Sequence, residues 1–475
     1  MYVQMRFKQL SILLVFLLIS PLFINCILIA KAQTAQAAPD FYLGVDVAFA
    51  SVAQTEQLID NVSSYTNFFV IGCAQKIGIN SYGGGIYNET SLSIISRYAY
   101  NKGLNFIVYS DDPSYPSKQW LENATKNFGS SFMGIYYFDE PGGRTLDQAP
   151  YPDYPVIISA NNFTDAADKY NETLSSWLRG PTLGITRNFD SPTEYQLFTS
   201  DYGLYWYDYG ARYNTVFTEF GVNSGRENYS RQLSIALCRG AANAFNQNWG
   251  VMITWAYSKA PYMENATDLM SDMRLAYNNG AKYIVVFDTN ANWTENVLSP
   301  QQQEAIKQFW QYAQANPRTV SQPSDRTAYV LPQDFGFGFR DPNDTIFGLW
   351  NANWNGAASL TFVADISMCV VTFLQMLGPN LDIIYPVSNG TIEQLGYKNV
   401  IFWNDTTIVP NMPSMPMASH AGGTYKTPSF IPFVRNIINS HNAIEIELYT
   451  IGVAAIVGVG VFGATLTIRR RRLNA

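Results

Sequence analysis

Histidine is almost absent from this chain of 475 residues, which has only two, His420 and His441, both close to the C-terminus. Its absence elsewhere excludes Ser-His-Asp and Cys-His nucleophilic sites and histidine-ligated zinc sites. Acid and base chemistry would therefore fall to carboxylates, tyrosines or lysines. We expect no metal site and no cofactor, because the sequence has no EF-hand-type calcium loop and no glycine-rich phosphate loop opening its first helix.

Charge is also scarce, since charged residues make up 14% of the chain and the net charge is −7. No basic patch lies outside the last few residues, so nucleic acid is not expected as a partner. The hydrophobic fraction of 47% and the aromatic fraction of 15% are ample for a packed core. The abundant tyrosine, asparagine, glutamine and tryptophan suit hydrogen bonding and stacking against sugars.

Cysteine is too rare for a disulfide framework. Of the four cysteines, Cys26 falls in the apolar N-terminal segment, and the other three, Cys73, Cys238 and Cys369, are widely separated and odd in number. We therefore expect buried free thiols.

The N-terminal segment, residues 1–37, has the order of a secretory signal peptide. Arg6 and Lys8 precede an apolar run from Leu10 to Ala30, and small-residue cleavage sites follow that run. The run is long for a signal peptide, so an uncleaved signal anchor is the alternative.

The C-terminal segment has the composition of a membrane anchor. The uncharged apolar run from Leu448 to Ile468 is long enough for one transmembrane helix, which we place at 447–468, and four arginines, 469–472, follow it. We expect residues 469–475 to be cytoplasmic, residues 406–446 to form a flexible stalk rich in Pro, Met, Ser and Gly, and the remainder to be extracellular at the cell membrane. Asn-x-Ser/Thr acceptor patterns between the two apolar ends predict a glycoprotein.

The region 38–316 alternates short apolar segments with helical ones, which predicts parallel strands joined by helices. Eight such units favour a (β/α)8 TIM-like barrel, with a doubly wound open sheet as the alternative. We place a short helix near Thr193–Thr199, the fifth strand at Gly203–Tyr207 and the sixth at Val216–Glu219, although the connection between the last two is then too short for a helix. A linker at 317–325 leads to a smaller α/β domain at 326–405.

Acidic and aromatic residues follow the predicted strands at their C-terminal ends, where TIM barrels carry their reactive groups. Glycoside hydrolysis needs such a set, because one carboxyl protonates the leaving oxygen while a second acts as nucleophile or base. The candidates for catalysis are Glu140, Glu219 and Asp139, and those for substrate binding are Asp46, Tyr137, Trp206, Asp208, Trp255 and Asp288.

The segment Gly134–Gly143, with its Asp-Glu-Pro, resembles the fourth strand of barrel-type glycoside hydrolases, and the run from Ala328 to Arg340 with Gly348–Trp350 resembles the domain after the barrel in archaeal cell-surface proteins. The resemblance implies that Glu140 is the general acid and Glu219 the second carboxylate. The sequence departs from the family pattern by placing Asp139, not Asn, before the acid, and by placing Glu219 on the sixth strand. The roles of Asp139 and Glu140 could also be exchanged.

Ordinary structural roles compete with these functional ones. Asp46 and Asp288 could be caps or loop anchors, and Trp206 and Trp255 could be core residues. We expect a membrane-anchored extracellular glycoside hydrolase-like protein that acts on a polysaccharide or glycan. The alternatives are a non-catalytic carbohydrate-binding or structural surface glycoprotein with a degenerate barrel and, with less support, a solute-binding protein.

Overall fold

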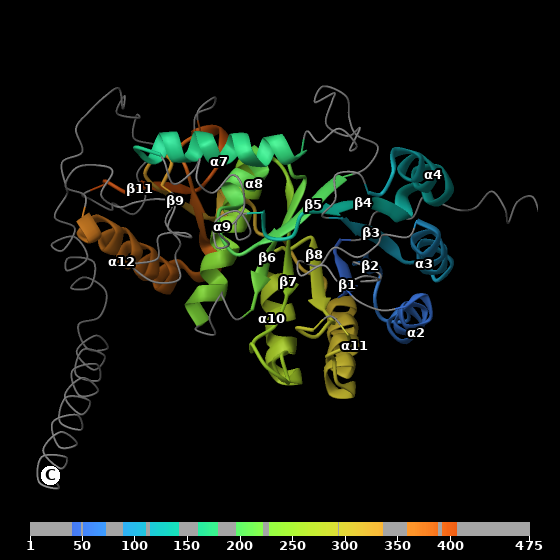
Figure 1. Ribbon diagram of the computed structural model, residues 1–475. Coiled ribbons are helices and arrows are strands. Elements are labelled where there is room, and N and C mark those ends of the chain that lie inside the picture. The colour runs from blue at the N-terminus through green and yellow to red at the C-terminus, as the bar shows by residue number, and fades with distance from the viewer. Residues whose placement is uncertain are drawn as a thin grey trace, which may run out of the picture. The chain divides into compact units, whose positions relative to one another are not determined.

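The computed structural model shows a closed barrel of eight parallel strands surrounded by helices (Figure 1). The structure describes residues 40–48, 51–72, 89–110, 115–141, 160–178, 196–221, 228–292, 294–335, 359–387 and 392–405. The predicted (β/α)8 barrel is therefore confirmed. The leader, stalk, membrane span and cytoplasmic tail predicted at 1–37, 406–446, 447–468 and 469–475 lie outside the described residues. Among the residues described, no helix combines the length and apolar character needed to cross a bilayer.

Each barrel strand pairs in parallel with the strand that follows it in the chain, and the last strand pairs with the first. The strands are β1 (Tyr42–Val47), β2 (Phe68–Ile71), β3 (Asn105–Ser110), β4 (Phe132–Tyr137), β5 (Gln196–Asp201), β6 (Thr215–Phe220), β7 (Asn248–Ile253) and β8 (Tyr283–Phe287). The helices are α2 (Val52–Val62), α3 (Glu89–Asn101), α4 (Lys118–Phe128), α7 (Phe163–Leu178), α8 (Tyr205–Gly210), α9 (Asn228–Ala244), α10 (Ala266–Asn278) and α11 (Pro300–Ala315).

Local sequence signals explain several helix boundaries. Ser51 caps α2 and Ser299 caps α11, each in a capping box with the glutamine three residues later. In α11, Pro300 follows the serine cap in the first helical turn, where its missing amide hydrogen costs no hydrogen bond. Gly129 closes α4 with φ of 55°, a conformation that glycine adopts without steric cost.

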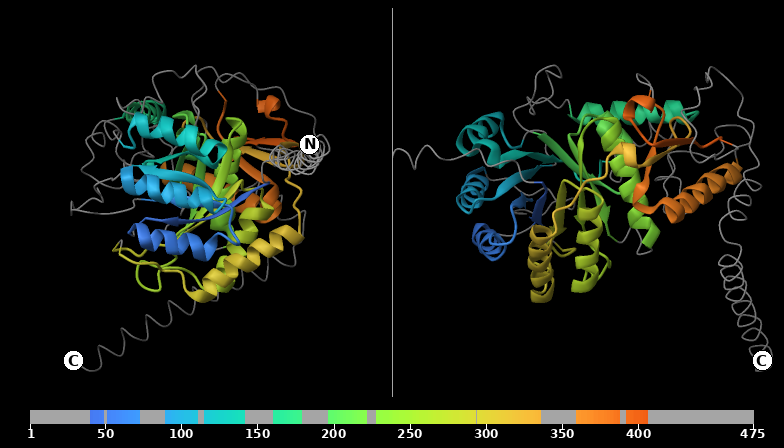
Figure 2. Two further views of the ribbon diagram at one scale, coloured as in Figure 1. Left: turned by 90° about the vertical axis from the view of Figure 1, so that its right-hand side faces the viewer. Right: turned by 180° about the vertical axis from the view of Figure 1, so that it is seen from behind.

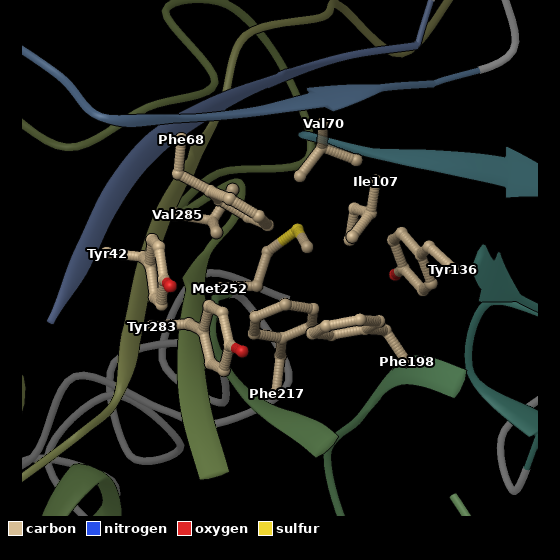
Figure 3. Close-up of a cluster of buried hydrophobic side chains, with 10 residues drawn as sticks. All are labelled: Tyr42, Phe68, Val70, Ile107, Tyr136, Phe198, Phe217, Met252, Tyr283 and Val285. Carbon is tan, nitrogen blue, oxygen red and sulfur yellow. The ribbon is translucent and has the colours of Figure 1, made fainter. Parts of the chain in front are cut away.

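Side chains of alternating strand positions fill the barrel, as Figure 3 shows for ten of them. Tyr42, Phe198 and Phe217 belong to this interior cluster, with Met252 near its centre. Because side chains alternate between the two faces of a strand, the residue two positions beyond an interior one also points into the barrel. This rule decides which residues at the strand ends face the barrel mouth.

The fifth strand lies earlier in the chain than we predicted. Residues 196–201 form β5, where we had expected a helix, and the aromatic run from Tyr205 to Gly210 forms the short helix α8, where we had expected the strand. Tyrosine and tryptophan favour strands in isolation, but here Tyr205, Tyr207 and Tyr209 are all buried by tertiary packing. The correction supplies the helical connection between β5 and β6 that the sequence assignment lacked.

A second, smaller parallel sheet has the strand order β10-β9-β11 and comprises β9 (Thr327–Val330), β10 (Leu381–Ile384) and β11 (Asn399–Phe402). The helix α12 (Ser359–Leu377) joins β9 to β10, and Figure 2 shows this sheet and α12 beside the barrel. The expected second α/β region is therefore present. Cys238 and Cys369 are buried free thiols, as predicted, whereas Cys73 lies outside the described residues.

Candidate functional site

The end of β4 has an unusual backbone that brings acidic side chains to the barrel mouth. Phe138 and Glu140 have φ of 54° and 49°, the left-handed region that residues other than glycine rarely adopt. The Phe138 amide donates to the Ser110 carbonyl at 2.9 Å, and the Glu140 amide donates to the Ser200 carbonyl at 3.0 Å. The neighbouring strands β3 and β5 therefore hold this segment in place. Backbone strain of this kind concentrates at functional sites.

Asp139 and Glu219 are joined through the hydroxyl of Ser200. The Ser200 Oγ lies 2.8 Å from Asp139 Oδ1 and 2.7 Å from Glu219 Oε1. The Tyr136 hydroxyl donates to the Ser200 Oγ at 2.7 Å and also contacts Asp139 Oδ1. Strands β4, β5 and β6 thus place two carboxyls and two hydroxyls in one connected network.

Glu219 also contacts Glu140, so the two predicted catalytic carboxyls are brought together. Burial raises the pKa of Glu219 well above its usual value, and the nearby charges of Glu140 and Asp139 raise it further. The Glu219 and Glu140 side chains share a hydrogen bond that raises the same pKa, whereas the hydrogen bond from Ser200 lowers it. Two carboxylates this close oppose each other's ionisation.

Asp46 is the fourth acid near this site and lies at the end of β1. It is 4% exposed, and its Oδ1 has no hydrogen-bond partner among the residues that the structure describes. Burial, and then the charge of Asp139, raise the pKa of Asp46 well above its usual value. Asp46 follows the interior residues Tyr42 and Gly44 at strand spacing, so it faces the barrel mouth rather than the helices.

Trp255 follows β7 and lies beside the last residue of β8. Its ring centroid is 5.8 Å from that of Phe287 and 5.7 Å from that of Tyr262, and its Nε1 donates to the Thr289 carbonyl at 2.7 Å. Phe287 packs against the barrel interior and pairs in register with Asp46. The indole is therefore fixed on the same rim as the acids and is only partly buried.

Four of the predicted substrate-binding residues make contacts that indicate structural roles, although the Asp288 amide donates to the Asp46 carbonyl at 2.8 Å. Tyr137 is fully buried, and its carbonyl accepts a hydrogen bond from Tyr213. Trp206, on α8, packs against Tyr385 of the second sheet region with centroids 5.3 Å apart. Their placement indicates packing roles.

The other two are buried acids. Asp288 accepts the backbone amides of Val297 and Leu298 at 2.8 and 2.9 Å, so it anchors the loop after β8. Asp208 is fully buried on α8, and its pKa is raised by burial and then by the charge of Asp201. Asp208 and Trp206 do not reach the barrel mouth because they lie on α8 and not at the end of the fifth strand, where we had predicted them.

Tyr136 and Ser200 were missed by the sequence analysis. Tyr136 is an interior residue of β4, and Ser200 lies two positions after the interior residue Phe198 of β5. The period of two along each strand would have identified both, once β5 was placed correctly. In the part of the chain that the structure describes, no group of three or more His, Cys, Asp or Glu side chains is arranged to hold a metal ion.

No protein-family model matches the chain, and no curated protein matches it. Similar solved structures include the β-galactosidase of the haloarchaeon Halorubrum lacusprofundi (10% identity, TM-score 0.47, 76% of this chain and 69% of that one). They also include the β-galactosidase of Marinomonas ef1 (10%, TM-score 0.48, 78% and 73%) and the catalytic module of a family 98 glycoside hydrolase from Streptococcus pneumoniae TIGR4 (11%, TM-score 0.42, 77% and 66%). By their names these three solved structures are glycoside hydrolases, and another similar structure is the spore coat polysaccharide biosynthesis protein SpsE of Bacillus subtilis (12%, TM-score 0.31, 60% and 72%).

Proposed function

We propose that the protein is a glycoside hydrolase that acts on a polysaccharide or other glycan through Glu140 and Glu219. The observation that carries the proposal is the direct contact of these two carboxyls at the C-terminal ends of β4 and β6. Glycosidic cleavage needs one carboxyl that carries a proton and a second that is ionised. Two acids in contact meet that need, because close negative charges oppose simultaneous ionisation.

The environment of Glu219 favours it as the group that carries the proton. Glu219 is 8% exposed, and burial together with two neighbouring acids opposes its ionisation. Glu140 would then be the nucleophile or base, the reverse of the roles that the sequence resemblance implied. Trp255 supplies an aromatic face on the rim for a sugar ring, and Asp46 supplies for a sugar hydroxyl a carboxyl oxygen that has no hydrogen-bond partner among the described residues.

A second candidate is a carbohydrate-binding protein without catalysis, and the same contact favours it. Retaining and inverting hydrolases separate their two carboxyls by roughly 5 to 9.5 Å, whereas a hydrogen bond joins Glu140 to Glu219. A glycosidic bond could enter between them only after that hydrogen bond breaks. In a protein that only binds glycans, the contact would persist when sugar is bound.

Turnover of glycans separates the two candidates. The full chain, purified in detergent, would be incubated with a panel of neutral, acidic and amine-bearing polysaccharides, and new reducing ends would be measured. We expect release from at least one substrate. Binding on a glycan array without any release of reducing ends would instead support the non-catalytic protein.

We also propose that the barrel is extracellular and held at the cell membrane by the apolar segment 447–468. The proposal rests on sequence, namely the leader at 1–37 and the arginines that follow the apolar segment. Protease added to intact cells should remove the barrel and leave a short membrane-bound fragment. Protection of the barrel until the cells are lysed would contradict this topology.

A further inference from the structure

Ser200 occupies the centre of the acidic site. Its Oγ is within hydrogen-bonding distance of three oxygens, Asp139 Oδ1 at 2.8 Å, Glu219 Oε1 at 2.7 Å and the Tyr136 hydroxyl at 2.7 Å. Ser200 is fully buried, so bulk water does not compete for these contacts. Ser200 therefore connects Glu219 on β6 to Asp139, which follows β4.

The hydrogens available in this network are fewer than its contacts. The network has four oxygen–oxygen contacts, because Tyr136 also touches Asp139. Each hydroxyl supplies one hydrogen, and an ionised carboxylate supplies none. When both carboxylates are ionised, two of the four contacts lack a hydrogen, and a proton on Glu219 supplies one of them.

The direction of the Ser200 hydroxyl consequently depends on Glu219. When Glu219 is protonated, it can donate to Ser200, and the serine hydrogen is free to point to Asp139. When Glu219 is ionised, Ser200 donates to Glu219 instead, and Asp139 loses that donor. Asp139 is then left with Tyr136 as its one hydroxyl donor among the described contacts.

We propose that the Ser200 hydroxyl couples the protonation of Glu219 to that of Asp139, so that a proton leaving one carboxyl is matched by one arriving at the other. The inference deepens the proposed function, on which its catalytic meaning rests. As a balanced step, protonated Glu219 gives its hydrogen to Ser200, and Ser200 gives its own hydrogen to the ionised Asp139 carboxylate; the reverse step returns the proton to Glu219. One O–H bond forms and one breaks at Ser200, and the serine is unchanged.

The coupling would let Asp139 take up the proton of Glu219 while Glu219 is ionised and return it when Glu219 next acts as an acid. Ser200 is in this sense a positioning residue, because it acts on Glu219 and not on the sugar. The titratable groups that act on Glu219 are Glu140 and Asp139, and the charge of Asp46 also acts on Tyr136. Each of these groups is acidic, so the hydroxyls of Ser200 and Tyr136 are the neutral donors of the network.

The test is a titration of the Glu219 carboxyl by carbon-detected NMR in full-length protein labelled with ¹³C-glutamate. The Glu219→Gln variant identifies the signal. Ser200→Ala removes the donor, so the pKa of Glu219 should rise by about one pH unit, the equivalent of one hydrogen bond to a charged group. Asp139→Asn removes a negative charge and should lower the pKa of Glu219. Ser200→Thr keeps the hydroxyl and should restore the wild-type value.

Thr66→Val provides a control, because Thr66 is a buried hydroxyl that donates to the Val62 carbonyl at 3.0 Å, outside the acidic network. This variant should leave the Glu219 titration unchanged. An unchanged Glu219 pKa in folded Ser200→Ala, or in Asp139→Asn, would overturn the proposal. If Ser200→Ala does not fold, the Asp139→Asn and Ser200→Thr titrations decide. Because the titration needs no substrate, its outcome is independent of whether any glycan is hydrolysed.

Discussion

The guanidinium of Arg239 on α9 lies 2.7 Å from the carboxylate of Asp382 on β10, and both side chains are almost fully buried. Arg326 reaches the other oxygen of the same carboxylate at 2.9 Å. Arg239 also donates to the backbone carbonyls of Pro379 and Leu381 at 2.7 and 2.9 Å. One buried acid therefore fastens the second sheet to a barrel helix.

We predict that Asp382→Asn destabilises the protein by about 3 to 5 kcal/mol, because it leaves two buried arginines without their counter-charge. Urea unfolding of the purified protein would measure the change. Glu122→Gln is the control, since the Lys118–Glu122 pair is exposed and 3.8 Å apart and should contribute no more than about 1 kcal/mol. Equal stability of Asp382→Asn and wild type would show that the junction does not support the fold.

Glu264 should make the stability of the protein depend on pH. The Glu264 carboxyl is buried beside Asp272, and burial followed by the charge of Asp272 raises its pKa to about 8, despite the Arg231 guanidinium at 3.0 Å. Because this folded-state pKa lies above the unfolded value, its contribution is fully present below about pH 4.5 and is lost as the pH rises through about 8. Glu264→Gln should therefore have the higher melting temperature at pH 9 but not at pH 5. The same melting temperature for both proteins at pH 9 would rule this out.

Gly134 should tolerate no side chain. A Cβ at this position of β4 would lie 2.0 Å from the Gln196 carbonyl oxygen, and its φ is 152°. We expect Gly134→Ala to destabilise the protein by about 1 to 3 kcal/mol, the usual cost of overpacking a core. The control is Gly103→Ala, which meets nothing within 4 Å but has φ of 77° and so carries only the backbone penalty. Thermal unfolding would compare them, and a smaller loss for Gly134→Ala than for Gly103→Ala would contradict the prediction.

The two tryptophans Trp206 and Trp255 should respond differently to truncation. Trp206→Ala removes packing against Phe245 and Tyr385, so it should cost about 3 kcal/mol of stability and leave glycan affinity unchanged. Trp255→Ala should weaken glycan binding at least tenfold, as expected for an aromatic anchor. Calorimetric titration with a bound glycan, together with urea unfolding, measures both quantities. Loss of affinity in Trp206→Ala alone would reverse these assignments.

The sequence predicted the barrel and the acids at its rim because both follow from local patterns. Apolar strands alternating with capped helices define the βα units, and the ends of β4 and β6 place Glu140 and Glu219 without further information. The fifth strand was misplaced because strand propensity favoured the aromatic run after Asp201, where burial against other elements determines the structure. Because of that error, we named Trp206 and Asp208 as site residues of the fifth strand and missed Ser200. The left-handed turns at Phe138 and Glu140 have no sequence signal, because they depend on hydrogen bonds that their amides donate to carbonyls of β3 and β5.

The most direct test of the proposed function compares hydrolysis by Glu140→Gln and Glu219→Gln with hydrolysis by the wild-type chain. Each substitution keeps the size of the side chain but removes its ionisation, and Glu304→Gln on the exposed face of α11 is the matched control. We predict that both site variants lose at least a hundredfold in kcat/KM while remaining folded, and that the control keeps full activity. Full activity in either folded site variant would show that the pair at the ends of β4 and β6 is not catalytic.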